Sequence, residues 1–131
     1  MADPTPVEVD QVLRFVLDEI DSVPELEALL LLWQNRPAAW NAADIARRLY
    51  IDPNQAQALL AHLSRKGMVA ADPDRADFYR YESRSPERDQ LMGRTEAVYR
   101  RQIVRISTLI HSKPSSAVRD FARAFRLTKE K

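Results

Sequence analysis

The sequence contains no cysteine, and only two of its 131 residues are glycine. Without cysteine there is no disulfide framework, no thiolate zinc site and no cysteine nucleophile. Two glycines are few for an all-β protein, which would need many tight turns. These absences favour a mainly helical protein and are compatible with a reducing compartment.

The sequence also lacks a long hydrophobic segment. The longest unbroken apolar run is Ala28 to Trp33, whereas a membrane span needs roughly 20 such residues. The first residues, Met1-Ala2-Asp3-Pro4, lack the basic and apolar regions of a signal peptide. We therefore expect no membrane partner and a cytoplasmic location.

Residues that could carry out catalysis are scarce. The two histidines are His62 and His111, and no spacing places a nucleophile or a set of metal ligands around either. His111 falls in the last turn of a predicted helix, where the helix dipole favours a cation. The sequence has no glycine-rich phosphate loop. We therefore predict that the protein is not an enzyme and needs no cofactor or metal.

The net charge of +1 conceals a gradient along the chain. Residues 1–35 carry eight acidic residues and one basic residue, net −7; residues 36–85 are net +2, and residues 86–131 are net +6. This asymmetry has two interpretations. One is an anionic partner on one side of the molecule, and the other is an acidic helix that pairs with a basic one.

Capping signals mark the helix starts. Thr5-Pro6-Val7-Glu8 offers an N-cap hydroxyl, a proline at the first helical position and a glutamate three residues after the cap. Similar signals begin at Ser22, Asn41, Asp52 and Ser85. Together with the apolar spacing, they predict helices over 7–20, 24–34, 42–50, 53–66 and 86–112, with a further stripe over 118–125.

The order of the predicted elements is that of a winged helix. The helix over 24–34 is apolar nearly all round, so it should form the centre of the core. The helices over 42–50 and 53–66 are separated only by Ile51-Asp52, and they should cross steeply. Short strands are predicted over 38–40, 68–71 and 78–82. The fold class is therefore mainly α with a small β-hairpin wing: a helix-turn-helix domain over 22–85, an N-terminal helix within 1–21 and C-terminal helices within 86–131.

Several segments resemble MarR-type transcriptional regulators. The similar segments are 45–49, the helix from Pro53, Leu63-Ser64-Arg65-Lys66-Gly67-Met68-Val69 and Asp72-Pro73-Asp74-Arg75, and the match covers roughly residues 22–82. The resemblance implies a homodimer through the terminal helices and double-stranded DNA as the partner. It also implies that the helix over 53–66 enters the major groove, and that Arg75, braced by Asp74, reaches the minor groove.

The resemblance and the charge pattern together give a set of candidate DNA-binding residues. The positions that would read bases by resemblance are Asn54, Gln55, Gln57 and Ala58, with Ala61 and His62 behind them. Amide side chains can bond the N6/N7 edge of adenine. Candidates for phosphate contact are Arg47, Arg48, Arg65, Lys66, Arg75, Arg80 and Arg84.

A protein-binding module remains the alternative. The helix over 53–66 has no basic residue before Arg65, and the wing carries three aspartates. A weakly charged face of small residues suits protein packing, so the domain could dock a protein partner and not bind DNA. Four aromatic residues, Trp33, Trp40, Phe78 and Tyr99, could line a ligand cleft or belong to the core.

Overall fold

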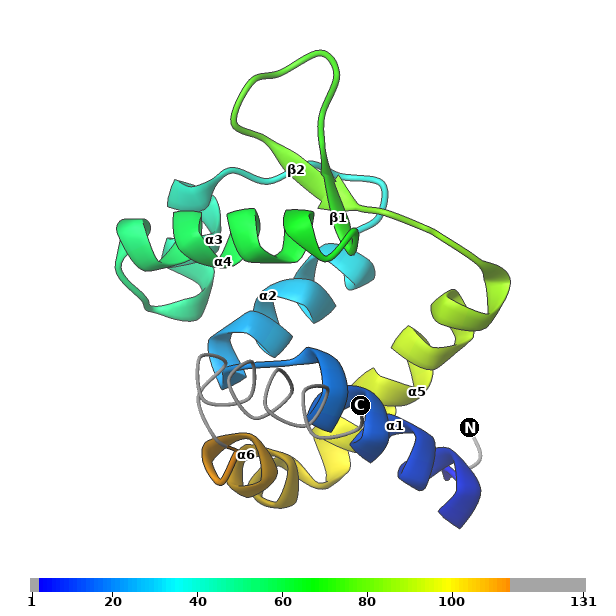
Figure 1. Ribbon diagram of the computed structural model, residues 1–131. Coiled ribbons are helices and arrows are strands. Elements are labelled where there is room, and N and C mark those ends of the chain that lie inside the picture. Colours follow the sequence, from blue (N-terminus) through cyan, green and yellow to red (C-terminus); the bar gives the residue numbers. More distant parts are fainter. Residues whose placement is uncertain (1–2, 114–131) are drawn as a thin grey trace, which may run out of the picture.

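Six helices and one β-hairpin make up residues 3–113, which are the residues that the computed structural model describes (Figure 1). The order of the elements is that predicted for a winged helix. The bounds are α1 (Pro6–Glu19), α2 (Val23–Gln34), α3 (Ala42–Leu49), α4 (Pro53–Arg65), β1 (Val69–Ala71), β2 (Tyr79–Tyr81), α5 (Pro86–Arg101) and α6 (Ile103–His111).

All five predicted helix starts are confirmed by N-cap hydrogen bonds. At α1 the Thr5 hydroxyl accepts from the Glu8 backbone N–H, and the Glu8 carboxylate accepts from the Thr5 backbone N–H. This reciprocal pair is a complete capping box. Helices α2, α3, α4 and α5 each begin with a polar side chain that accepts a first-turn N–H; these side chains are Ser22, Asn41, Asp52 and Ser85.

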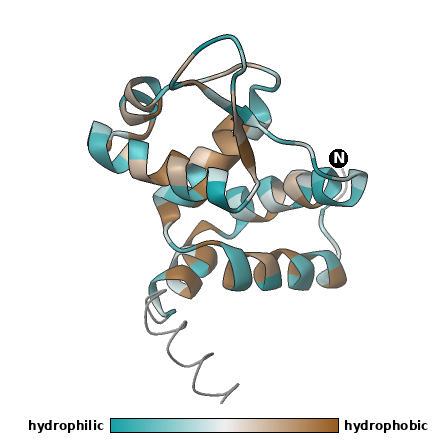
Figure 2. Cartoon of the chain, turned by 45° about the horizontal axis from the view of Figure 1, so that its top comes forward, coloured by the Kyte–Doolittle hydropathy of each residue, from teal (hydrophilic) through white to brown (hydrophobic). Residues whose placement is uncertain are grey.

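Helix α2 forms the centre of the core, as its sequence predicts. Seven of its residues are buried, and Leu26, Leu29 and Leu32 have no exposed surface. Its neighbours α3, α4 and α5 and strand β2 all contact it. Figure 2 shows the hydrophobic side of the surrounding helices turned inward and the hydrophilic side turned outward. Burial of these apolar side chains is the main source of stability in this fold.

Helices α3 and α4 form the helix-turn-helix. Tyr50 ends α3 in the left-handed conformation, at φ 58°, and the chain enters α4 after only Ile51 and Asp52. The face of α4 that packs inward was predicted correctly, because Ala56, Leu59, Leu60 and Leu63 are its buried residues. After the helix Gly67 has φ 75°, which a residue with a Cβ atom would adopt only at a cost.

The wing is a two-stranded antiparallel hairpin in which Val69 pairs with Tyr81 and Ala71 with Tyr79. The predicted strand over 38–40 is wrong. Only Trp40 joins the sheet, through a single bridge to Tyr79 with two backbone hydrogen bonds of 2.8 Å. The preceding residues, 35–37, form a turn that ends α2, which leaves too little chain for a strand.

The prediction of one continuous helix over 86–112 is also wrong. The chain bends at Gln102, with φ −128° and ψ 47°, between α5 and α6. The bend turns α6 across α1 (Figure 1), and it buries Ile106 and Ile110. A straight helix would have carried these two side chains past the end of the core, so tertiary packing overrides the local preference.

Within residues 3–113, the acidic and basic parts of the chain pair with each other at two places. Helix α1 packs on α5, where Arg94 Nε lies 2.9 Å from Glu8 Oε2, and Arg101 Nη2 lies 2.6 Å from Asp3 Oδ1. The predicted stripe over 118–125 lies outside the described residues. Within residues 3–113, no helix has the length and apolar character needed to cross a bilayer.

Candidate nucleic-acid interface

The outward face of α4 presents the side chains that the sequence singled out. Asn54, Gln55, Gln57 and Ala58 are all exposed. They lie in the first two turns of the helix, opposite the buried leucines that fix α4 on the core. Backbone N–H groups at the start of a helix also favour a nearby anion. This part of α4 is therefore rigidly mounted, polar and accessible.

Three of the candidate arginines are exposed on the two helices of the helix-turn-helix: Arg47 and Arg48 in the last turn of α3, and Arg65 in the last turn of α4, at the other end of the helix from the amide side chains. Two of them have contacts within the chain. Arg47 forms an ion pair with Asp44 one turn earlier, and the Arg48 guanidinium lies 5.5 Å from the centre of the Trp40 ring. Exposed pairs of this kind contribute little to stability, so both arginines can exchange these partners for a ligand.

The wing carries Arg75 at its tip and Arg80 on β2. The Arg75 guanidinium lies 4.1 Å from the centre of the Phe78 ring, and its Nε is 3.6 Å from Asp72 Oδ2. The aspartate beside Arg75 is therefore Asp72, and the expectation that Asp74 braces it is wrong. The backbone N–H of Asp74 instead donates to Asp72 Oδ1 at 3.0 Å. This turn holds Asp72 at the base of the loop, facing Arg75.

A hydrogen-bonded group ties the wing to α5. The Tyr81 hydroxyl donates to Asp89 Oδ1 at 2.8 Å, and the Ser83 hydroxyl donates to Asp89 Oδ2 at 2.6 Å. Burial, and then the bond to Asp89, raise the pKa of Tyr81 well above its ordinary value. The bonds from Ser83 and Tyr81 lower the pKa of Asp89. These hydrogen bonds to Asp89 fix β2, the second strand of the wing, relative to α5.

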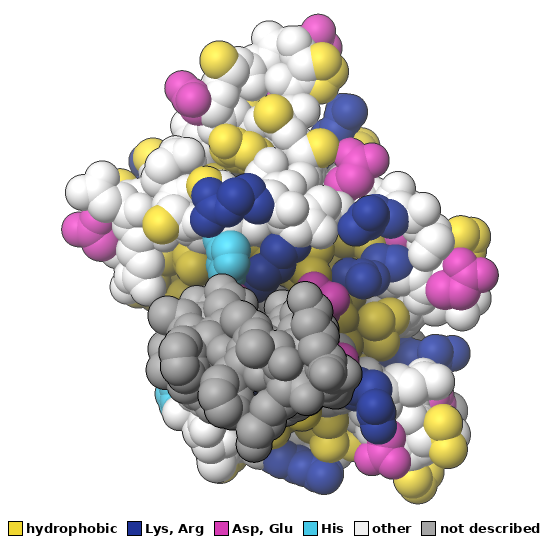
Figure 3. All heavy atoms as spheres, viewed as in Figure 1, with side chains coloured by type: hydrophobic (Ala, Val, Ile, Leu, Met, Phe, Trp, Pro, Cys, Tyr) yellow, Lys and Arg dark blue, Asp and Glu magenta, His cyan; other side chains and the backbone are white. Residues whose placement is uncertain are grey.

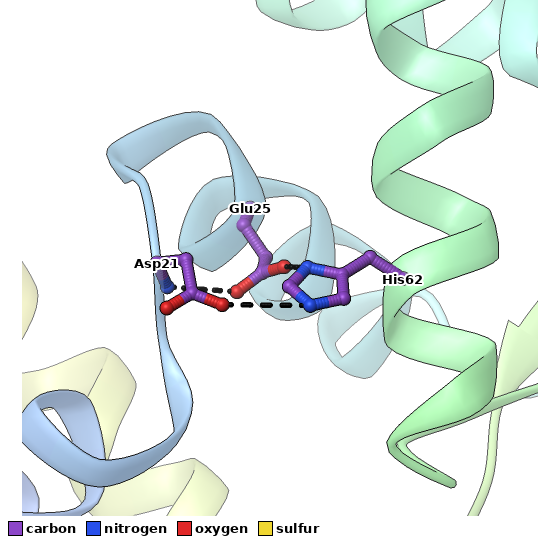
Figure 4. A group of neighbouring side chains, drawn as sticks. All are labelled: Asp21, Glu25 and His62. Atoms are coloured by element: carbon purple, nitrogen blue, oxygen red, sulfur yellow. Dashed lines mark hydrogen bonds and ion pairs between the residues drawn. The ribbon is translucent and has the colours of Figure 1, made fainter. Parts of the chain in front are cut away.

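His62, expected behind the base-reading positions of α4, is turned toward the core and not toward the exposed amide side chains. Its side chain faces the start of α2, with Nδ1 2.5 Å from Glu25 Oε2 and Nε2 3.5 Å from Asp21 Oδ2 (Figure 4). Lys66, one turn later, places Nζ 2.9 Å from Glu25 Oε1 and 3.2 Å from Asp21 Oδ2. His62 and Lys66 thus bind α4 to the core and do not join the arginines at the surface.

Sequence reasoning missed this cluster because Glu25 reads as an ordinary capping residue. It stands three residues after Ser22, which is the spacing of a capping box. Only half of that box forms: the Ser22 hydroxyl accepts from the Glu25 N–H, but the Glu25 carboxylate turns toward α4. The i, i+4 spacing of His62 and Lys66 was the available signal, since it places both on one side of a helix.

Comparison with known proteins gives structural relatives only. No protein-family model matches the sequence, and no curated protein matches it. A MarR family protein from Mycobacterium tuberculosis has a similar structure, with 22% sequence identity and a TM-score of 0.52, over 94% of this chain and 86% of that chain. The chain has a MarR-like fold.

Two further MarR family structures are similar to this chain, with lower TM-scores. One, from Bacillus stearothermophilus, has 17% identity and a TM-score of 0.48, over 95% of this chain and 84% of that chain. The other, a transcriptional regulator from Rhodococcus, has 18% identity and a TM-score of 0.47, over 92% and 82%.

The MarR-like fold does not gather the four candidate aromatic residues around one cleft. Trp33 packs edge-on against Tyr81, with ring centres 5.3 Å apart. Phe78 lies under Arg75 in the wing. Trp40 and Tyr99 line two different surface pockets, and burial, followed by Glu27, raises the pKa of Tyr99 to about 12. The four aromatic residues therefore lie at different sites and do not line a common ligand cleft.

The charge on this MarR-like domain is mixed. Figure 3 shows Lys and Arg side chains spread over the visible face, with acidic side chains among them and near the wing. The wing loop itself contributes Asp72, Asp74 and Asp77 against Arg75. On the face that Figure 3 shows, electrostatic attraction to an anionic partner therefore depends on individual exposed arginines and not on a continuous basic surface.

Proposed function

We propose that the protein is a DNA-binding transcriptional regulator of the MarR-like winged-helix type, acting in the cytoplasm and without enzymatic activity. Helix α4 enters the major groove, and the wing lies at the minor groove. The observation that carries this proposal is the exposed amide row of α4, formed by Asn54, Gln55 and Gln57, with exposed arginines on α3, at the end of α4 and on the wing. Amides suit base edges, and arginines suit phosphates.

In this proposed interface, the uncharged amide side chains and the charged arginines have different roles. The amide row brings hydrogen bonds but no charge, so it supplies preference for sequence and little affinity. Phosphate contacts come from Arg47, Arg48, Arg65, Arg75 and Arg80, of which Arg80 is half-buried on β2. We leave His62 and Lys66 out of the interface, since both side chains face carboxylates of the core.

A binding experiment with the purified full chain tests the proposal. Short genomic duplexes should be bound at low salt, and a subset should stay bound in excess nonspecific DNA, because phosphate contacts alone cannot distinguish sequences. Fluorescence anisotropy with labelled duplexes measures both properties. An absence of nucleic-acid binding at low salt would contradict the proposal.

Gln57→Ala should relax the preference for one base position in each half-site. A bidentate amide contact is worth roughly 1–3 kcal/mol of discrimination, so the cognate duplex should lose about 5- to 150-fold in affinity for each half-site, while random DNA loses little. The matched control is Gln90→Ala, at an exposed glutamine on α5. Equal losses on cognate and random DNA would show that Gln57 does not read bases.

A protein partner is the second candidate function, and two observations favour it. Arg47, Arg48 and Arg75 all make contacts within the chain, and Tyr50 at the turn before α4 is 94% exposed. Aromatic side chains such as tyrosine are enriched in protein interfaces. Binding that persists at high salt and needs no nucleic acid would support this function over DNA binding.

We further propose a homodimer through the terminal helices. Leu17 of α1 and Ile103 and Val104 of α6 are large apolar side chains left exposed. Between α1 and α6 lies a groove of about 760 Å³ whose apolar lining includes Leu13, Leu17 and Leu109. Uncovered apolar surface of this kind favours association, and a two-fold dimer can cover the same patch on both chains.

Val104→Asp should convert the dimer to a monomer at micromolar concentration. The side chain is 74% exposed in the single chain, so the substitution should leave the fold intact and place a charge in the interface. Light scattering after size-exclusion chromatography gives the mass. Ala43→Asp, at an exposed position of α3, is the control and should remain dimeric. A wild-type mass of one chain would overturn the dimer itself.

A further inference from the structure

A buried carboxylate oxygen at the start of α2 faces a histidine ring and makes no hydrogen bond of regular geometry within residues 3–113. The Glu25 side chain is 1% exposed. Its Oε1 accepts from the Asp21 backbone N–H and from Lys66 Nζ, both at 2.9 Å. Within residues 3–113, no group makes a hydrogen bond to Oε2, which lies against His62 Nδ1 at 2.5 Å. A buried oxygen of a carboxylate in this state calls for a cation or a proton.

Three ligand-bearing side chains converge at this oxygen. Asp21, Glu25 and His62 come from the α1–α2 connection, the first turn of α2 and α4, and Figure 4 shows them pointing toward one another. One carboxylate oxygen from each acid and one ring nitrogen lie within 4.8 Å of one another. The side chains of His62 and Asp21 are 33% and 24% exposed, which leaves a route from solvent.

We propose that Asp21, Glu25 and His62 bind a divalent metal ion of the zinc class. Two carboxylates and one imidazole are a ligand set that Zn²⁺ takes, with a water molecule in the fourth position. Ligand atoms at about 2.0–2.1 Å from a tetrahedral ion lie roughly 3.3 Å apart. To admit the ion, the side chains must separate Nδ1 from Oε2 and bring Asp21, which now lies 3.5 Å from the other ring nitrogen, closer to the same side of the ring.

Lys66 is compatible with the ion because it uses the other side of Glu25. Its ammonium contacts Oε1 and leaves Oε2 to the metal. Lys66 also contacts Asp21 Oδ2, so its positive charge competes with the ion for that carboxylate. The nearby ammonium of Lys113 donates to the carbonyls of Val16 and Ile20 instead, and burial, followed by the charge of Lys66, lowers the pKa of Lys113.

The consequence is a metal-dependent link between α4 and the core. A bound ion would join α4 to the segment that leads from α1 into α2, at the base of the helix proposed to enter DNA. The proposal for the ion stands on the cluster alone and does not require DNA binding. It can be tested on the free full-length chain.

The test is a Zn²⁺ titration of the untagged protein in a non-chelating buffer, followed by calorimetry. Wild type should bind one ion per chain. His62→Gln keeps a polar side chain but loses the ligand nitrogen, and the affinity should fall by about 10- to 100-fold or more. His111→Gln is the matched control, because His111 is the other histidine of the sequence and is exposed on α6; its affinity should equal that of wild type.

The variant Lys66→Met provides a second, independent test of the metal site. Removing the competing charge should tighten Zn²⁺ binding and enlarge the rise in melting temperature that zinc produces, since ligand binding to the native state stabilises it. The proposal is overturned if wild type has no site tighter than roughly 100 µM, or if His62→Gln binds as tightly as His111→Gln. Both results are independent of whether the protein binds DNA.

Discussion

Lys66→Met should lower the free energy of unfolding by about 3 kcal/mol in metal-free buffer. The substitution preserves the apolar stem of the side chain and removes the ammonium that pairs with the buried carboxylate of Glu25 at 2.9 Å. Breaking a buried ion pair from one side typically costs about 3–5 kcal/mol, because the other charge is left without compensation. We expect the lower end, since His62 still faces Glu25 and Lys66 is 17% exposed.

Urea denaturation measures this loss, and Arg65→Met is its matched control. Arg65 precedes Lys66 and is exposed, so its replacement removes the same charge from the same turn and should change stability by no more than about 0.5 kcal/mol. Equal losses in the free energy of unfolding for the two substitutions would show that the ion pair between Lys66 and Glu25 does not stabilise the fold. Glu25→Leu added to Lys66→Met should recover part of the loss, because both buried polar groups are then gone.

The sequence was sufficient to predict the helix-turn-helix and its core. The capping signals at Thr5, Ser22, Asn41, Asp52 and Ser85 act locally, over three or four residues, and all of them form. The inward face of α4 was equally predictable, since helical periodicity sorts apolar from polar side chains without knowledge of the partner.

The bend at Gln102 could not be predicted in the same way. Residues 86–112 contain no proline after Pro86, and their apolar spacing continues through the bend. What ends α5 is the position of α1, which offers a surface for Ile106 and Ile110 only if the chain turns. That surface is formed by residues some 90 positions away in the sequence, so no local pattern contains it.

The exposure of the candidate base-reading side chains on α4 was predictable from the sequence, but the contacts of the charged candidates were not. The amide row lies exposed on α4, as expected. The pairing of Lys66 and His62 with Glu25 was missed, because it joins side chains 37–41 residues apart and depends on how α2 crosses α4. Lys66 and His62, which were expected at the DNA-binding surface, therefore contact the core instead, and the candidates for phosphate contact that remain are arginines.

Arg47→Ala/Arg48→Ala should accordingly cause the largest loss of DNA affinity. A dimer loses four arginines next to α4 at once, and each phosphate contact contributes a salt dependence of about −0.9 in the slope of log K against log [salt]. If all four touch phosphates, the slope should become shallower by roughly 3.6, and affinity near 0.1 M salt should fall by about 10³- to 10⁴-fold. Anisotropy titrations over a range of salt concentrations give both quantities.

The double substitution Arg94→Ala/Arg101→Ala separates this effect from a loss of charge in general. It removes the same charge from α5, where both arginines pair with acidic residues of the N-terminal segment, and it should leave the salt slope unchanged as long as the dimer persists. An equal slope for Arg47→Ala/Arg48→Ala and wild type would place the two arginines outside the interface. If the partner is instead a protein held by apolar burial, binding should barely respond to salt in either variant, because no counterions are released.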